Sequence, residues 1–454
     1  MPEFIRPRRR VLAGGIAAVL LTATATATAA AITAPATAAA IAASATTALS
    51  SQPGLAQVPA QYRALPVESA VYTLGDAAFE VPGFHTEGDS GPLAKIELTG
   101  VVHYPKNLGR GRQPVVLISH GLWETCADRE ADRAEKKASA DLAQTTDPAE
   151  QARLEAIIAK SFKALNAWPC AAGTPAMPSY RGYDYLGKAL AAQGIITISI
   201  SANGVNAGEG GQIQDEARAA LINKHLSLWQ RLSTKGDGPL AHALKGAQRF
   251  KGHADLTNVG LSGHSRGGRG MAFQAADVHQ AQWPAGASVK AILPLAAVEH
   301  YSPDDEPNTP EHTPYRVTNI PVGIIAGSCD GATDGRRFDF YDQKNKAPLY
   351  QWYALGANHN FFNTQWSPAS GQVRSYDDAV LSNTNPPPAP GYCRDSAEPI
   401  KDDKQLTEGQ QHAVFLMYAS AFYRRHLLDD RSVDPLLTGR IKPLPAIEVR
   451  TDLP

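Results

Sequence analysis

The chain has 454 residues, with 43 Lys and Arg against 44 Asp and Glu, and its formal net charge at pH 7 is −1. This balance provides no excess positive charge to attract nucleic acid or an anionic membrane surface, so we expect neither as a partner. Apolar residues make up 43% of the chain, which is sufficient for a large hydrophobic core.

Residues 1–30 predict an export signal. A basic start with Arg8, Arg9 and Arg10 is followed by an apolar stretch and then by small residues with several A-x-A cleavage sites. This is the layout of a secretory signal peptide, and the arginines also resemble a twin-arginine signal. The apolar stretch is short and interrupted by Thr, which disfavours a stable membrane anchor. We therefore expect a secreted, extracellular protein.

Residues 31–61 consist mostly of Ala, Thr, Ser and Pro. Such a segment has too few large apolar side chains to offset the entropy lost on ordering, so we expect a disordered lead-in. Residues 62–454 are expected to form one domain, because α/β enzymes often place more than ~150 residues in a single domain.

The chain has four cysteines, Cys126, Cys170, Cys329 and Cys393. Because an exported protein enters an oxidising compartment, this even number predicts two disulfides, with three pairings open. The cysteines are too far apart in the sequence for a typical zinc site, and we expect no metal.

From residue 95 onward, short apolar runs alternate with amphipathic segments. The runs lie at 95–105, 114–121, 194–201, 258–263, 289–298, 321–327 and 349–355. Most are continuous and β-branched, as expected of strands buried on both faces. Helical patterns separate several runs, and another follows the last one. This alternation predicts an α/β fold, with a mostly parallel central sheet and helices on both faces.

The segment 126–170 interrupts this alternation, because it is rich in Ala, Glu and Lys and has no strand pattern. Asp147, Pro148 and Glu150 form a strong helix start. We expect a helical hairpin inserted after the 114–121 strand. A Cys126–Cys170 disulfide would close its base and leave Cys329 to pair with Cys393. The hairpin is either a lid over the substrate or a rigid decoration.

The segment 258–270, NVGLSGHSRGGRG, contains no dinucleotide-binding G-x-G-x-x-G, and it lacks the Lys and Ser or Thr of a phosphate-binding loop. It does match G-x-S-x-G, centred on Ser265. A strand pattern precedes the motif and a helix pattern follows it, which is the context of a serine nucleophile on a tight turn. The turn would present the hydroxyl at a helix N-terminus, which favours developing negative charge.

A nucleophilic serine needs a base and an acid that orients the base. In this arrangement they follow in the order Ser, acid, His, each after a strand. Asp330 follows the 321–327 run and His359 follows the 349–355 run. We therefore predict the triad Ser265, Asp330 and His359, with Asp334 as a rival for the acid.

The backbone N–H groups of Leu122 and Arg266 are the candidate oxyanion donors, because one follows a strand end and the other follows the nucleophile. Trp123 would line the adjacent cleft or belong to the core. His264 would border the cleft, or pack and hydrogen-bond beneath it. The side chains of Arg266 and Arg269 would bind an acidic group of the substrate or anchor their helix by a salt bridge.

The chain resembles secreted bacterial α/β-hydrolases of the polyester-hydrolase and chlorophyllase-like group. The similar pieces are SHGLW, the pattern Y-x-x-L-x-x-x-L-A-x-x-G from Tyr183 to Gly194, GHSRGG, the Asp330 segment and GANHNFFN. The resemblance spans roughly residues 95 to 427. It implies an α/β-hydrolase fold and carboxylic ester hydrolysis through an acyl-enzyme, without a cofactor. The 126–170 hairpin departs from the group, so a polymeric or chlorophyll-like substrate does not carry over.

These patterns together predict a secreted serine esterase acting on a small or polymeric ester. Two alternatives stay open from the sequence. An amidase or peptidase would use the same triad, and a catalytically silent binding protein would keep only the scaffold.

Overall fold

The computed structural model describes residues 65–86, 91–298, 310–333, 338–342, 344–381, 388–395, 401–444 and 447–454. The predicted export signal and lead-in lie outside these ranges, and so does Asp334, the rival acid. No helix in the described part of the chain combines the length and the apolar character needed to cross a membrane.

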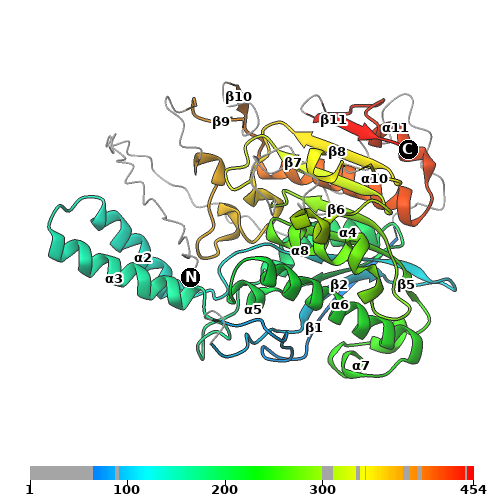
Figure 1. Ribbon diagram of the computed structural model, residues 1–454, viewed down its shortest axis with the longest axis horizontal. Helices are drawn as coiled ribbons and strands as arrows, with labels where there is room; N and C mark the ends of the chain where they lie inside the picture. Colours follow the sequence, from blue (N-terminus) through cyan, green and yellow to red (C-terminus); the bar gives the residue numbers. More distant parts are fainter. Residues whose placement is uncertain are drawn as a thin grey trace, which may run out of the picture.

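A nine-stranded sheet runs through the molecule (Figure 1). Its strands, in spatial order, are β1 (Val67–Thr73), β2 (Thr99–Pro105), β4 (Ile196–Ile200), β3 (Gln113–Ser119), β5 (Ala254–His264), β6 (Val289–Leu295), β7 (Val322–Gly327), β8 (Leu349–Ala354) and β11 (Ile447–Asp452). All neighbours from β4 to β8 are parallel, whereas β1, β2 and β11 pair antiparallel. The predicted mostly parallel sheet is confirmed. A separate two-stranded sheet joins β9 (Tyr392–Arg394) and β10 (Asp402–Lys404).

Helices cover both faces of the sheet, as predicted. They are α4 (Asp184–Ala191), α5 (Asn203–Asn206), α6 (Gln212–Lys235), α7 (Pro239–Ala243), α8 (Arg266–Ala275), α9 (Phe338–Tyr341), α10 (Glu408–Leu427) and α11 (Asp434–Leu437). On β3, Val115 and Leu117 pack into the core beneath α6 and α8, whereas Val116 and Ile118 pack into the core beneath α4 and α10. Because both faces are covered, the central strands are continuous apolar runs rather than alternating ones.

The segment 126–170 forms a helical hairpin of α2 (Arg129–Leu142) and α3 (Pro148–Leu165) that extends away from the body of the molecule (Figure 1). The Asp128 carboxylate caps α2, and the Asp147 carboxylate caps α3 by accepting from the Ala149 amide. The predicted hairpin and its helix start are therefore confirmed.

The parallel arrangement determines where the candidate site residues can meet. The carboxyl ends of parallel strands lie at one edge of a sheet, and ligand sites of open α/β sheets form there. The loops after β3, β5, β7 and β8 carry Leu122, Ser265, Asp330 and His359 respectively. The fold therefore brings all four to the same edge.

Candidate active site

Ser265 occupies the turn between β5 and α8 in a sparsely populated conformation, with φ 57° and ψ −126°. The surrounding glycines make this turn sterically feasible. A Cβ at Gly263 would collide with the Gly267 carbonyl, and a Cβ at Gly267 would lie 2.5 Å from the Ser119 oxygen. Strand, turn and helix therefore approach more closely than any side chain at these two positions would allow.

The backbone around Ser265 is held on two sides. Its amide donates to the Leu295 carbonyl at 3.0 Å, and its own carbonyl accepts from the Gly268 amide at 2.9 Å. The loop after β3 touches the serine directly, because a Cβ added at Gly121 would lie 2.5 Å from Ser265 Cβ and 3.2 Å from its Oγ. The loop that carries Leu122 is thus in contact with the serine side chain.

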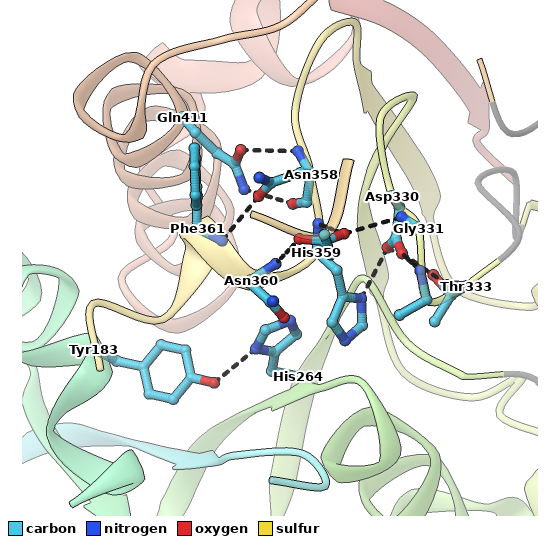
Figure 2. A network of polar contacts seen from close by, with 12 residues as sticks. Tyr183, His264, Asp330, Gly331, Thr333, Asn358, His359, Asn360, Phe361 and Gln411 are labelled. Carbon is cyan, nitrogen blue, oxygen red and sulfur yellow. Dashed lines mark hydrogen bonds and ion pairs between the residues drawn. The ribbon is translucent and has the colours of Figure 1, made fainter. Parts of the chain in front are cut away.

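His359 and Asp330 form a buried pair, with 2.9 Å between His359 Nδ1 and Asp330 Oδ2 (Figure 2). Thr333 donates to the same carboxylate through its amide and its hydroxyl. Burial alone would raise the pKa of Asp330, but the charge and hydrogen bond of His359 and the bonds from Thr333 outweigh it and hold the pKa below its ordinary value. An ionised Asp330 accepts the Nδ1 proton, which leaves Nε2 as the acceptor.

The ring of His359 lies next to the serine turn, because its centroid is 4.7 Å from that of His264, the residue before Ser265. The loop that carries His359 is also fixed to α10. The Asn358 amide donates to the Gln411 side-chain oxygen at 2.9 Å, and the Gln411 amide group donates to the Asn358 carbonyl at 2.7 Å (Figure 2). The two hydrogen bonds give this loop a defined path beside the serine turn.

A second buried carboxylate, Asp378, lies beside this pair. It belongs to no sequence motif that predicts a site residue. Its Oδ2 accepts from the backbone amides of Gly331 and His359 at 2.9 Å each, and its Oδ1 accepts from the Asn360 amide at 2.8 Å. Burial and the negative charge of Asp330 raise the pKa of Asp378 to about 6.

The loop after β3 is held from below by a buried polar network. The Gly121 carbonyl accepts from His120 Nδ1 at 2.9 Å and from Asn206 Nδ2 at 3.0 Å. His120 Nε2 accepts from the Ala202 amide at 2.9 Å, and burial lowers the pKa of His120 to about 3, so the ring is neutral with its proton on Nδ1. Arg218 donates to both the His120 carbonyl and the Asn206 side chain.

The Leu122 amide belongs to the same peptide plane as the Gly121 carbonyl. Two donors fix that carbonyl, so they also fix the direction of the Leu122 N–H. No carbonyl within the described ranges accepts a hydrogen bond from this amide. It is therefore well placed to donate to a ligand atom beside Ser265.

His264 and Trp123 belong to an aromatic cluster that contacts the ring of His359 through His264 and Trp366. His264 is completely buried and contacts the Tyr183 hydroxyl through Nδ1 at 2.9 Å (Figure 2). Its ring also stacks on Trp366. Burial lowers its pKa well below the ordinary value. Trp123 is also buried, and it stacks on Trp366 at 4.7 Å and on Tyr376 at 5.6 Å. Both side chains are therefore buried among aromatic rings rather than exposed to solvent.

Arg266 and Arg269 anchor their helix, which is the less specialised of the two roles expected for them. Arg266 donates to the Gln214 side-chain oxygen at 2.9 Å, and Arg269 forms an ion pair with Asp215 at 2.8 Å. Both partners lie on α6, so the contacts join two helices on one face of the sheet.

Both predicted disulfides are present, Cys126–Cys170 and Cys329–Cys393. The first closes the base of the hairpin. The second joins the residue before Asp330 to β9. Within the described ranges, no three His, Cys, Asp or Glu side chains form a cluster suited to a metal ion.

The sequence matches no protein-family model, and no curated protein is significantly similar to it.

Proposed function

We propose that the protein is a serine hydrolase that cleaves carboxylic esters through an acyl-enzyme. The observation that carries this proposal is the buried Asp330–His359 hydrogen bond beside Ser265, whose backbone has the strained conformation of a nucleophile turn. The resemblance of GHSRGG and GANHNFFN to α/β-hydrolase motifs supports it, because these segments contain Ser265 and His359. Two disulfides and the export signal expected from the sequence favour action outside the cell.

In this mechanism, Ser265 Oγ attacks the ester carbonyl while His359 Nε2 takes its proton. The Leu122 and Arg266 amides donate to the oxyanion of the tetrahedral intermediate, and Asp330 stabilises the imidazolium. His359 then returns the proton to the leaving alcohol, and the acyl group stays on Ser265. A water molecule, deprotonated by His359, attacks this acyl-enzyme and releases the carboxylic acid, and Ser265 regains its proton.

Covalent labelling tests the proposal. A fluorophosphonate probe should modify the wild-type protein at one site, and Ser265→Ala should remove the label. Ser262→Ala is a matched control, because Ser262 is buried on the same strand and donates to the Leu293 carbonyl away from the triad. An unlabelled wild-type protein, or a labelled Ser265→Ala variant, would contradict the proposal.

The same triad also cleaves amides, so parallel assays are needed to establish the bond that is cleaved. Turnover of p-nitrophenyl esters with little turnover of peptide p-nitroanilides is the expected result. A series of acyl chain lengths would then define the acid side of the substrate.

A further inference from the structure

Asp378 connects the two loops that carry the acid and the base. Its carboxylate is fully buried and accepts the Gly331 amide from the loop after β7. It also accepts the His359 and Asn360 amides from the loop after β8. All three donors are backbone groups adjacent to or within the Asp330–His359 pair, so one side chain holds both loops by their backbone.

We propose that Asp378 is a positioning residue that sets the distance between Asp330 and His359 and places a second negative charge behind the imidazole. This inference rests on the proposed function. Each loop leaves a different strand. Near the strand ends, the Cys329 amide donates to the Ala357 carbonyl and the Gly356 amide donates to the Ser328 hydroxyl oxygen. Farther along the loops, where the acid and the base lie, the described links are the Asp330–His359 hydrogen bond and the contacts of Asp378. A displacement of about 1 Å in a catalytic group can lower a rate about a hundredfold, so a second link has a kinetic consequence.

The negative charge of Asp378 and its hydrogen bonds both support the function of His359 as the base. Asp330 and His359 are the charged neighbours that most affect it, and at neutral pH the carboxyl is largely ionised. In that state it accepts all three amides and favours the imidazolium that forms during attack. Asp377, on the same segment, instead accepts from Asn358 and Gln405 side chains.

A purely structural role would lower stability without changing the titration of the base. Asp378→Asn separates the two roles, because it removes the charge and leaves one or two amides facing an NH₂ group. We expect kcat per labelled site to fall at least about tenfold with KM within about threefold. The acid limb of the kcat/KM profile should move to lower pH by about one unit, because the imidazolium loses a nearby negative charge.

Asp377→Asn is the matched control, since it removes the adjacent carboxylate and its hydrogen bonds, and its acid limb should stay in place. Asp378→Glu is a second variant in case the Asn variant does not fold. It keeps the charge, so its acid limb should match the wild type while its kcat falls. Wild-type kcat per labelled site in either Asp378 variant would overturn the inference. A wild-type protein that is not labelled would instead overturn the proposed function.

Discussion

The conformation of Ser265 illustrates how much of the site is determined by individual residues. A non-glycine residue at a positive φ costs about 1–3 kcal/mol, and it persists only where its surroundings determine it. Here the surroundings are the Leu295 carbonyl, the Gly268 amide and the missing side chains of Gly263 and Gly267. The glycines therefore maintain a strained serine rather than a flexible loop.

Gly267→Ala should consequently destabilise the protein and abolish labelling of Ser265. The new Cβ would lie 2.5 Å from the Ser119 oxygen and 2.6 Å from the His120 oxygen, so the end of β3 would have to move. Overpacking of this kind costs about 1–3 kcal/mol, measurable by chemical denaturation. Gly409→Ala is the control, because a Cβ there meets nothing within 4 Å. Wild-type stability and labelling in Gly267→Ala would refute the steric argument.

Among the helices, α5 and α6 support the loop after β3, which carries the proposed oxyanion donor Leu122. Asn206 ends α5 and donates to the Gly121 carbonyl, and Arg218 on α6 donates to Asn206 and to the His120 carbonyl. Arg218 is completely buried, so its guanidinium depends on these acceptors and on the nearby charge of Asp215. The helices thus help to determine the direction of the Leu122 amide.

Asn206→Asp should lower kcat with little change in KM. The carboxylate would keep Arg218 as a partner, but it would place an oxygen instead of an N–H against the Gly121 carbonyl. Removal of one oxyanion donor typically lowers kcat about 10²–10³-fold. A donor that points in the wrong direction should lower kcat by at least about tenfold. Asn203→Asp is the control, because that buried amide donates to the Met177 carbonyl. An unchanged kcat in Asn206→Asp would contradict the proposal that the Leu122 amide is an oxyanion donor.

The sequence predicts the central strands and the hairpin because their signals are local. Buried parallel strands are continuous apolar runs, and Asp147 with Pro148 announces a helix. The edge strands β1 and β11 were not predicted, because each is partly exposed and has no apolar run. Asp378 and Asn206 were not predicted as site residues for a different reason. Their partners are backbone groups of distant segments, and no spacing in the sequence records such contacts.

At the scale of the whole molecule, the two disulfides constrain different parts of the chain. Cys126 and Cys170 are 44 residues apart and close the hairpin, whereas Cys329 and Cys393 are 64 residues apart and hold the Asp330 loop against β9. Each closure is worth about 4 kcal/mol on chain-entropy grounds. Arg374 adds a second attachment for the hairpin, through ion pairs with Glu124 and Glu135.

This difference in location predicts different effects on activity. Replacing both Cys126 and Cys170 by Ser should lower the free energy of unfolding by roughly 4 kcal/mol. Ester turnover per labelled site should stay unchanged. Replacing both Cys329 and Cys393 should also lower stability, and it should reduce turnover because Asp330 follows Cys329 directly. Thermal unfolding and hydrolysis of a p-nitrophenyl ester measure the two effects. An equal loss of turnover in the Cys126 and Cys170 variant would indicate that the hairpin belongs to the substrate site as a lid. It would contradict the interpretation of the hairpin as a rigid decoration.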